Sequence, residues 1–391
     1  MVSLISHSLP FCPHHFPSSP SEALNTLAGS LTTDKFYDLL CSYIEDSRID
    51  ELKGLDSDLL LQQNSVGETL LHLAASRGDA KINRFMIERT GTVLFNVKTE
   101  YNGYTPLHLA MYGNNDEITN LLLEKAKEES MNDFLNQPDS YGQTALHHAA
   151  YQGNLKACQQ LYPIMSDQAI LLQTKGRKQT ILHFAVQIGN KEIVKFLLTR
   201  KELAKELLLK TDCYGQTVLH WAAGDGNYAL VDIIIDNAGH LSDEEAKRFF
   251  LMKKKEGFTA LHLAAHSKDN ASIRSLVMVA KSRKIPELIS TTDDYGQTAL
   301  HWTAAKGNVE ASKLLCNEMD SSMINIKMTG RGQTALHFAA HGAHLETIKI
   351  LIDKGADKSI RDVNGMTAYE WAKENLKIAS KDAIIAMLKP T

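Results

Sequence analysis

The stretch GQTALHHAAYQGN, residues 142–154, decides the fold because near-copies of it recur along the chain. In the fullest copies a glycine is followed two residues later by threonine, then by Leu-His and by two small residues. The threonines of the nine copies are Thr69, Thr105, Thr144, Thr180, Thr217, Thr259, Thr298, Thr334 and Thr367. Neighbouring threonines lie 33 to 42 residues apart. A period of this length, with insertions, predicts an array of one small structural unit.

Each position of the repeated phrase has a local structural reason. Glycine suits a tight turn with positive φ, and threonine is a good N-cap for the helix that follows. The Leu-His-x-Ala-Ala run gives this helix an apolar face and keeps it thin enough for a neighbour to pack closely. A second glycine, such as Gly153, ends the helix in a left-handed residue. Apolar pairs such as Ile193 and Val194 then predict a second, antiparallel helix.

One helix pair cannot bury both of its faces, so we expect the copies to stack side by side. The predicted fold class is therefore all-α, a solenoid of helix-turn-helix units. The segment GYTPLHLA, Gly103–Ala110, resembles the ankyrin repeat almost word for word. The resemblance extends from about residue 34 to the C-terminus, and it implies β-hairpin-like loops between the helix pairs.

The predicted domain organisation is a flexible N-terminal tail over residues 1–30 and a repeat domain over 31–391. Within that domain, 34–64 is a degenerate N-terminal cap, 65–363 holds eight repeats with insertions, and 364–391 is a C-terminal capping repeat. Caps are expected because the end units of an array would otherwise expose apolar faces to water.

The insertions and the inter-helix turns depart from a regular pattern. Insertions follow the second helices, so we expect longer second helices and longer hairpins, with the largest insertion before the Thr259 copy. Lys268 stands where the inter-helix glycine is expected, and two other copies have this glycine one residue early, at Gly113 and Gly342. A lysine in the left-handed region is strained, so the Thr259 copy is a predicted weak point.

Composition and charge limit the possible functions. The chain has 391 residues, 43% of them apolar and 23% charged, and its formal net charge is −4. These values predict a soluble protein, with no stable membrane insertion and no overall attraction to nucleic acid. The five cysteines are far apart without CxxC spacing, and the first residues do not resemble a secretory signal. We expect a monomer in the reducing cytoplasm.

The histidines are mostly explained by the repeat. Eight of the 16 occupy one repeat position: His72, His108, His147, His183, His220, His262, His301 and His337. The family resemblance implies that these rings bond to the backbone around the turns. Four more, His148, His266, His341 and His344, lie outside the series with no acidic residue at matching spacing. We therefore predict no metal site and no cofactor.

Aromatic residues and basic clusters also have plain interpretations. Trp221, Trp302, Phe184 and Phe338 replace a leucine after the motif histidine, which favours core packing over a stacking platform for bases or sugars. Two basic clusters are Lys253, Lys254 and Lys255 with Lys247 and Arg248, and Lys281, Arg283 and Lys284. A solvated face is the first interpretation of both clusters, and an anionic lipid or acidic partner is the second.

The resemblance places partner binding on residues that vary between repeats without a structural duty. The loops that precede the motif threonines contribute Tyr104, Tyr141, Gln143, Tyr214, Gln216, Tyr295 and Gln297. The first helices contribute Arg77, Tyr112, Tyr151, Gln152, Asp225 and Lys306. Tyrosine suits protein recognition because it offers a large area at low entropic cost. The alternative is that the loop tyrosines pack against neighbouring loops, and the sequence leaves both possibilities open.

No phosphate-binding loop, HExxH, GxSxG or kinase motif occurs in the chain. We predict a non-catalytic scaffold that binds another protein, of unknown identity, through a concave groove. A second hypothesis is a bacterial effector that is translocated into the host cytoplasm and redirects a host protein. A third is an enzyme or modifier that acts through the N-terminal tail, where Cys12 is the only visible nucleophile.

Overall fold

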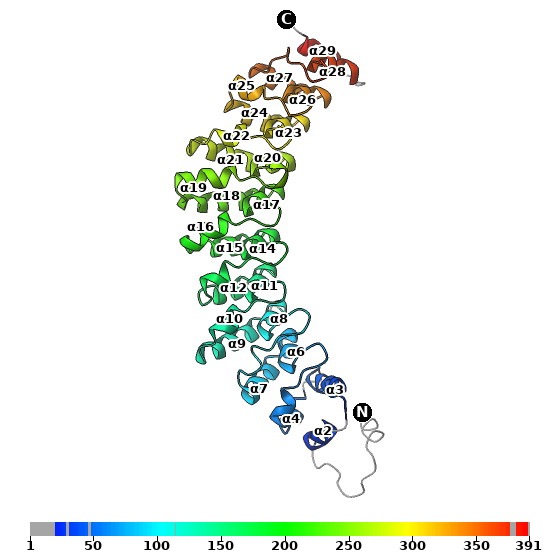
Figure 1. The fold of residues 1–391 in the computed structure, drawn as a ribbon, viewed down its shortest axis with the longest axis vertical. Helices are drawn as coiled ribbons and strands as arrows, with labels where there is room; N and C mark the ends of the chain where they lie inside the picture. Colours follow the sequence, from blue (N-terminus) through cyan, green and yellow to red (C-terminus); the bar gives the residue numbers. More distant parts are fainter. Residues whose placement is uncertain (1–19, 29–30, 46–47, 114, 376–380, 390–391) are drawn as a thin grey trace. The chain divides into compact units, whose positions relative to one another are not determined.

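The structure is a computed structural model that describes residues 20–28, 31–45, 48–113, 115–375 and 381–389. In these ranges the regular secondary structure is helical, and the β-type pairing is one isolated bridge between Gln63 and Thr69. The chain forms two compact units, residues 1–148 (unit 1) and 149–391 (unit 2), each described here by itself. Figure 1 shows helix pairs that follow one another in chain order within each unit. The predicted all-α fold is confirmed.

Unit 1 contains helices of three kinds, named by their place in the repeat. First helices follow a motif threonine: α6 (Leu70–Arg77), α8 (Pro106–Tyr112) and α11 (Ala145–Tyr151), whose last residues belong to unit 2. Second helices are α7 (Ala80–Thr90) and α9 (Asp116–Glu128), and short third helices are α5 (Ser57–Leu60) and α10 (Asn132–Asn136). The N-terminal end is built from α2 (Pro20–Ala28), α3 (Thr33–Glu45) and α4 (Ile49–Leu52).

Unit 2 repeats the same three kinds. Its first helices are α14 (Ile181–Ile188), α17 (Val218–Gly224), α20 (Ala260–Ser267), α23 (Ala299–Ala305), α26 (Ala335–His341) and α28 (Ala368–Asn375). The second helices are α12 (Leu155–Leu161), α15 (Lys191–Leu197), α18 (Tyr228–Asn237), α21 (Asn270–Ser282), α24 (Val309–Asn317), α27 (Leu345–Asp353) and α29 (Lys381–Leu388). The remainder are α13 (Asp167–Ile170), α16 (Lys201–Leu209), α19 (Asp243–Leu251), α22 (Glu287–Ser290), α25 (Ser321–Ile324) and the 3-10 turns η1 (Ala238–His240) and η2 (Lys255–Gly257).

The helices of unit 2 pack in rows. First helices contact first helices of the neighbouring repeats, as α17 does with α14 and α20, and second helices do the same, as α18 does with α15 and α21. The alanine pair of the motif lies at this contact, and Ala222 and Ala223 are fully buried. Small side chains are required there because a larger residue would push neighbouring helices apart.

The helix ends follow the sequence rules. Each described motif threonine from Thr69 to Thr334 hydrogen-bonds with the motif histidine three residues on, and glycines such as Gly78 and Gly189 end first helices with positive φ. Most second helices begin at asparagine or aspartate caps, for example Asn190, whose side chain accepts from the backbone N–H of Ile193, whereas α27 begins at His344 without a side-chain cap. The predicted helix starts and stops are confirmed.

The loop just before each motif threonine is called a tip here. Successive tips of unit 2 are joined by single backbone hydrogen bonds, such as the one from the N–H of Thr329 to the carbonyl of Tyr295, 2.7 Å. Within one tip the N–H of Asp293 donates to the carbonyl of Gln297, 2.8 Å, which closes a hairpin-like turn. The tips therefore form one continuous edge of the unit without extended strands in the described residues.

The insertions differ in part from the prediction. Some second helices are long, since α9 and α21 each have 13 residues. The insertions around residues 199–210 and 238–254, however, form separate third helices, α16 and α19. A new helix starts at Ser242 because its hydroxyl and the Glu245 carboxylate form a reciprocal capping box. The Ser-x-x-Glu spacing was visible in the sequence and indicates this start.

The chain ends also refine the prediction. Residues 1–19 lie outside the described residues, but Pro20–Ala28 forms helix α2, which packs on α3 and α4, so the expected tail does not extend to residue 30. Leu24 is 1% exposed and makes α2 part of the cap. At the other end Glu370 replaces the motif histidine and accepts a hydrogen bond from the backbone N–H of Thr367, 2.6 Å. A carboxylate can cap this helix while having no N–H to offer a further repeat.

Six described residues other than glycine are left-handed, and the sequence indicated one of them. Lys268 has φ +64, as predicted for the Thr259 copy. In the copy with an early Gly342, the left-handed residue is Ala343, φ +59, while Gly342 itself is helical. The others are Lys178, φ +53, in the tip before Thr180, and Ser130, Glu256 and Lys284. The sequence does not mark Lys178 because the nearby Gly176 hides the change in spacing.

Candidate functional site

Four tips are held by one aspartate each. In the first of them, the Asp139 carboxylate oxygen Oδ1 accepts hydrogen bonds from the backbone N–H groups of Tyr141 and Gln143, both 2.8 Å. Asp212, Asp293 and Asp362 repeat this arrangement with distances of 2.8 to 2.9 Å. These bonds fix the turn, and they hold the backbone of the residue at its apex, which is tyrosine in three tips and Asn364 in the fourth.

The second oxygen of each tip aspartate bonds to a ring nine residues later. Asp139 Oδ2 accepts from His148 Nε2 at 2.9 Å, and Asp212 Oδ2 accepts from the indole N–H of Trp221 at 3.1 Å. The same bond joins Asp293 to Trp302 and Asp362 to Trp371. This corrects two expectations: His148 does have an acidic partner, and the tryptophans are half-buried bridges to the tips rather than simple core residues.

The motif histidines link each repeat to the next. His72 Nδ1 accepts from the backbone N–H of Thr69 at 3.1 Å, so the ring proton is on Nε2, which donates to the carbonyl of Tyr104 at 3.0 Å. The bond to the following tip recurs at His108, His183, His220, His262 and His337. His301 faces the corresponding carbonyl of Gln333, but its Nε2 lies outside hydrogen-bonding geometry. The predicted structural role of these histidines is confirmed.

Burial keeps the motif histidines neutral. Desolvation lowers the pKa of His220 and of His301 to about 4, and it lowers the pKa of His72, His183, His262 and His337 as well. A neutral ring with one acceptor and one donor nitrogen is the form that the two hydrogen bonds require. These rings therefore serve the fold and not acid–base chemistry.

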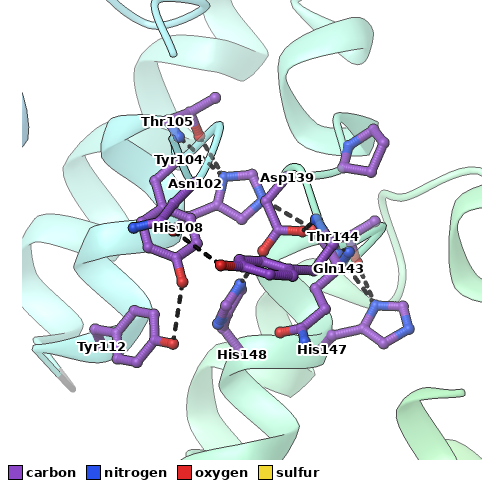
Figure 2. Close-up of polar contacts among 12 residues, drawn as sticks. Asn102, Tyr104, Thr105, His108, Tyr112, Asp139, Gln143, Thr144, His147 and His148 are labelled. Carbon is purple, nitrogen blue, oxygen red and sulfur yellow. Dashed lines mark hydrogen bonds and ion pairs between the residues drawn. The ribbon is translucent and has the colours of Figure 1, made fainter. Parts of the chain in front are cut away.

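Unit 1 gathers aromatic and titratable side chains around His148 (Figure 2). Tyr112 lies 4.9 Å from the His148 ring, and Tyr104 and His108 contact its faces and edge at 5.5 and 5.4 Å. The hydroxyls of Tyr104 and Tyr112 are 3.3 Å apart. The side chains of His148 and Asp139 are 3% and 0% exposed. Among these five residues, Tyr112 is the exposed one.

Burial and hydrogen bonds shift the pKa values of three groups in this cluster. Burial acts to raise the pKa of Asp139, but the hydrogen bonds from His148 and from the Gln143 N–H outweigh it and the pKa is lowered. Burial, assisted by the neighbouring His148, lowers the pKa of His108. Burial and the hydroxyl of Tyr112 raise the pKa of Tyr104. The His148–Asp139 pair is buried, so the side chain that this cluster places at the surface is Tyr112.

The predicted binding residues fall into two groups. Eight are exposed: Arg77, Tyr112, Tyr141, Tyr151, Gln152, Tyr214, Asp225 and Tyr295. The five tyrosine side chains among them are between 43% and 55% exposed. In unit 1, the hydroxyl of Tyr141 donates to Asn102 of the preceding tip at 3.1 Å, so this tyrosine has a contact between tips and remains half exposed. In unit 2, the Nζ of Lys255 lies over the Tyr214 ring at 5.2 Å.

The other five are half-buried and have local structural roles: Tyr104, Gln143, Gln216, Gln297 and Lys306. The backbones of the three glutamines close the tips and accept from motif histidines, as the Gln143 carbonyl does from His108 at 3.2 Å. The Nζ of Lys306 donates to the carbonyl of His266 at 2.7 Å and so satisfies the end of the preceding first helix. The exposed tyrosines are the stronger candidates for partner contact.

The first helices of unit 2 also carry pairs of rings in edge-to-face contact. The last turn of one helix contacts the ring four residues after the motif threonine of the next: the ring centroids of Tyr151 and Phe184 are 5.8 Å apart, and those of His266 and Trp302 are 5.3 Å apart. His341 and Trp371 repeat this pair at 5.3 Å. The sequence does not reveal these pairs because each ring belongs to a different repeat.

The two basic clusters are mostly engaged with neighbouring repeats. Lys247 pairs with Glu287 at 2.7 Å and Lys281 pairs with Glu318 at 3.2 Å. Lys253 donates to the carbonyl of Thr292, and the guanidinium of Arg283 donates to carbonyls near η1. These contacts support the solvated interpretation for most of both clusters.

The described residues hold no group of three or more His, Cys, Asp or Glu side chains placed to bind a metal ion. None of their helices is both long and apolar enough to span a bilayer. The described cysteines, Cys41, Cys158, Cys213 and Cys316, form no disulfide, and burial raises the pKa of Cys158 and of Cys316 to about 12. Cys12 lies outside the described residues.

The chain resembles known proteins along most of its length. A family model described as ankyrin repeats in three copies matches residues 40–134, 164–245, 200–285, 239–327, 276–362 and 321–387, and a single ankyrin repeat matches 141–164. The solved ankyrin repeat domain of Bcl-3 has the same fold, with a TM-score of 0.51 and 22% identity, covering 64% of this chain and 100% of that one.

Curated relatives are similar over their repeats. The probable 26S proteasome regulatory subunit p28 of Saccharomyces cerevisiae is 26% identical, over 40% of this chain and 66% of that protein. NF-kappa-B inhibitor zeta of Homo sapiens is 24% identical over 74% and 37%, and the serine/threonine-protein kinase TNNI3K of Mus musculus is 28% identical over 39% and 19%. The chain thus spans less than two thirds of each of these relatives. Because the family models match well over half of its residues, the chain belongs to the ankyrin repeat family.

Proposed function

We propose that this protein is a non-catalytic scaffold that binds another protein through its tips and first helices. The observation that carries the proposal is the set of exposed tyrosines at repeated positions, Tyr112, Tyr141, Tyr151, Tyr214 and Tyr295. Their backbones are fixed by tip aspartates or by helices, so little entropy is lost when a partner covers the rings.

The family supports the same conclusion. An ankyrin repeat is typically a non-catalytic interaction module, and the match to TNNI3K is confined to a part of that kinase. The buried histidines and aspartates are occupied by hydrogen bonds within the repeats, which leaves the exposed edge for binding. We further propose that the protein acts as a monomer in the cytoplasm.

The test replaces Tyr141, Tyr214 and Tyr295 together by alanine. We expect the triple variant to keep its helical circular dichroism and to lose captured partners that the unaltered chain retains, measured by quantitative affinity capture. The matched control is Tyr228→Ala, because Tyr228 is equally exposed at 54% but begins a second helix. Partners retained equally by the triple variant would reject the tips as the binding surface.

The effector hypothesis needs a test that leaves the fold intact. Removing residues 384–391 would delete Ile384 and Leu388, which are both fully buried in the contact of α29 with α28 and α27. Substitution of the exposed Ala386 and Lys389 by glutamate changes the chemistry of this segment without opening the core. If a reporter fused to the chain is delivered equally well with and without these two substitutions, the hypothesis of a C-terminal delivery signal is rejected.

A further inference from the structure

Unit 2 carries a band of positive charge across three successive tips. Residues 172–179, 210–216 and 252–258 contain seven basic and two acidic residues, although the chain as a whole has a net charge of −4. The basic residues of this band, called the basic band here, are Lys175, Arg177, Lys178, Lys210, Lys253, Lys254 and Lys255. A local excess of this size creates a field that the global charge does not reveal.

The three tips lie side by side. The backbone N–H of Cys213 donates to the carbonyl of Arg177 at 2.9 Å, and that of Lys255 donates to the carbonyl of Tyr214 at 2.8 Å. The amide of Gln173 adds a bond to the carbonyl of Thr211 at 2.8 Å. The basic side chains of the first and third tips therefore flank the middle tip, whose apex is the exposed ring of Tyr214.

The two acidic residues of the band do not neutralise it. Asp212 is 5% exposed, and its carboxylate is occupied by the N–H groups of Tyr214 and Gln216 and by the indole of Trp221. Glu256 pairs with Lys254 at 3.0 Å. Both negative charges are thus directed at groups within the protein.

Four cations of the band are available to a ligand. Lys175, Arg177 and Lys178 are exposed, and their side chains form no ion pair or hydrogen bond with any described residue. Lys255 is exposed and contacts the Tyr214 ring alone, at 5.2 Å. Cation–π contact holds an ammonium group near the ring while leaving it free to bind an anion.

The backbone of the first tip is strained at Lys178, and the strained residue carries one of the positive charges of the band. Lys178 has φ +53 where every other described tip has a glycine: Gly67, Gly103, Gly142, Gly215, Gly257, Gly296, Gly332 and Gly365. A non-glycine residue there costs on the order of 1 kcal/mol. This tip has no aspartate, and the Thr174 hydroxyl accepts the Gln179 N–H instead, 3.0 Å, as the Thr99 hydroxyl accepts the Tyr104 N–H in the tip before Thr105. The lysine and the absence of an aspartate both make the tip more positive, and the lysine does not stabilise the turn.

We propose that the basic band binds an acidic segment of a partner protein, whose carboxylates pair with Arg177, Lys178 and Lys255 beside the ring of Tyr214. This inference rests on the proposed function, because it names the chemistry of a partner for the same edge of tips. A guanidinium and two ammonium groups on the tips that flank Tyr214, one of them over its ring, match carboxylates spaced along an extended chain.

Charge distribution favours an acidic protein over a nucleic acid. The next tip presents the exposed Asp294, so the positive track ends after three tips. Tyr214 is the one exposed large aromatic side chain of the band, whereas single-stranded nucleic acids use several rings along a longer basic groove. A short acidic segment fits a short band.

The test measures binding of a fluorescein-labelled oligoglutamate peptide to the full chain by fluorescence anisotropy. The variant that reverses the charge of the basic band, called the patch variant, is Lys175→Glu with Arg177→Glu and Lys178→Glu. The matched control is Lys191→Glu with Lys195→Glu and Lys313→Glu, which reverses three exposed lysines on α15 and α24 and changes the net charge equally. Oligolysine and oligouridylate of similar length serve as probes of the opposite charge and of nucleic acid.

We expect saturable binding of oligoglutamate that weakens strongly between about 50 and 300 mM salt. The patch variant should lose at least tenfold in affinity, and the control should stay within twofold. Lys178→Gly should weaken binding by two- to threefold while raising the melting temperature, a combination that a purely structural lysine would not give. No binding of oligoglutamate, an equal loss in the control, or tighter binding of oligouridylate would overturn the proposal.

The outcome separates this inference from the proposed function. If the tyrosine triple variant loses captured partners while oligoglutamate fails to bind the unaltered chain, the scaffold function stands and the acidic partner is rejected. If captured partners persist in the tyrosine variant and oligoglutamate binding is lost in the patch variant, the basic band binds acidic segments without the tyrosine edge, and the proposed function in its stated form fails.

Discussion

In both units a tip aspartate accepts a hydrogen bond from a ring N–H, but the ring differs between the units. In unit 1 the tip aspartate Asp139 holds His148, and both side chains are buried. In unit 2 the tip aspartates Asp212, Asp293 and Asp362 hold tryptophans that are half-buried. A ring N–H nine residues after the aspartate is what the tip requires, and either ring supplies it.

The difference lies in what each tip exposes. The buried His–Asp pair of unit 1 leaves a surface of tyrosines, among them Tyr101, Tyr112 and Tyr141. The tips of unit 2 that include Lys175 and Lys255 expose positive charge around Tyr214. One repeat architecture thus presents two chemistries, because the apex of a tip is free to vary once its aspartate or threonine has fixed the turn.

The largest expected difference between the units appears on acidification. Burial lowers the pKa of His72 and His108 in unit 1, and of five motif histidines in unit 2: His183, His220, His262, His301 and His337. Because the pKa of each of these histidines is lower in the folded chain than in the unfolded chain, the unfolded chain binds protons at a higher pH. The free energy of unfolding is therefore highest above about pH 6.5 and decreases as the pH falls below that value. Each histidine contributes a slope of up to about 1.4 kcal/mol per pH unit.

We therefore expect unit 2 to lose several kcal/mol more than unit 1 between pH 6.5 and 5. All three tryptophans, Trp221, Trp302 and Trp371, lie in unit 2, so their fluorescence follows this unit alone. Hydrogen exchange of peptides from α6 to α9 follows unit 1. Simultaneous unfolding of both regions at one pH, or no loss above pH 4.5, would contradict the histidine assignment. The lowered pKa of Asp139 acts in a separate window, because its stabilisation is lost only below about pH 3.8.

A smaller effect is expected from removal of a tip aspartate. Asp139→Ala should destabilise unit 1 by about 3 kcal/mol, because it leaves two backbone N–H groups and a buried histidine without their acceptor. Asp293→Ala should cost about 2 kcal/mol, since Trp302 is half-buried and its bond is longer, 3.4 Å. Urea unfolding measures both.

The control for the tip aspartates is the adjacent Asp294→Ala. Asp294 is exposed, so we expect its removal to change stability by less than about 0.5 kcal/mol. Equal effects of Asp293→Ala and Asp294→Ala would show that the hydrogen bonds of the tip aspartate do not stabilise the turn. Equal effects at Asp139 and Asp293 would show that the choice of ring does not matter.

The smallest effect concerns the inter-helix turns. Gly78 in unit 1 and Gly153, Gly189, Gly226 and Gly307 in unit 2 are left-handed glycines, whereas two further turns of unit 2 have Lys268 and Ala343. Lys268→Gly should raise the stability of unit 2 by about 1 kcal/mol because glycine adopts φ +64 without strain. Lys268→Ala removes the same side chain and keeps the strain, so it should give no gain. A lower melting temperature for Lys268→Gly would contradict this account.

Much of the fold could be predicted from residues close together in the sequence. Thr69 and His72 are three residues apart and form the helix cap, and Gly78 ends the same helix by its own conformational freedom. These interactions depend on local geometry, so the repeated phrase predicts them wherever it occurs. The place of Tyr141, Tyr214 and Tyr295 at the apex of a turn was predictable for the same reason. Their exposure was not, because the sequence left packing against a neighbouring tip open.

The sequence alone determined the repeat, its helix caps and the positions of the tip turns, since each depends on contacts within a few residues. Only the tertiary structure decided that His148 and Trp221 bond to tip aspartates and that the tips of Arg177 and Lys255 lie on either side of the tip of Tyr214. These features join residues of different turns or different repeats. Their partners are set by how repeats stack, and stacking depends on the summed packing of many side chains rather than on any local motif.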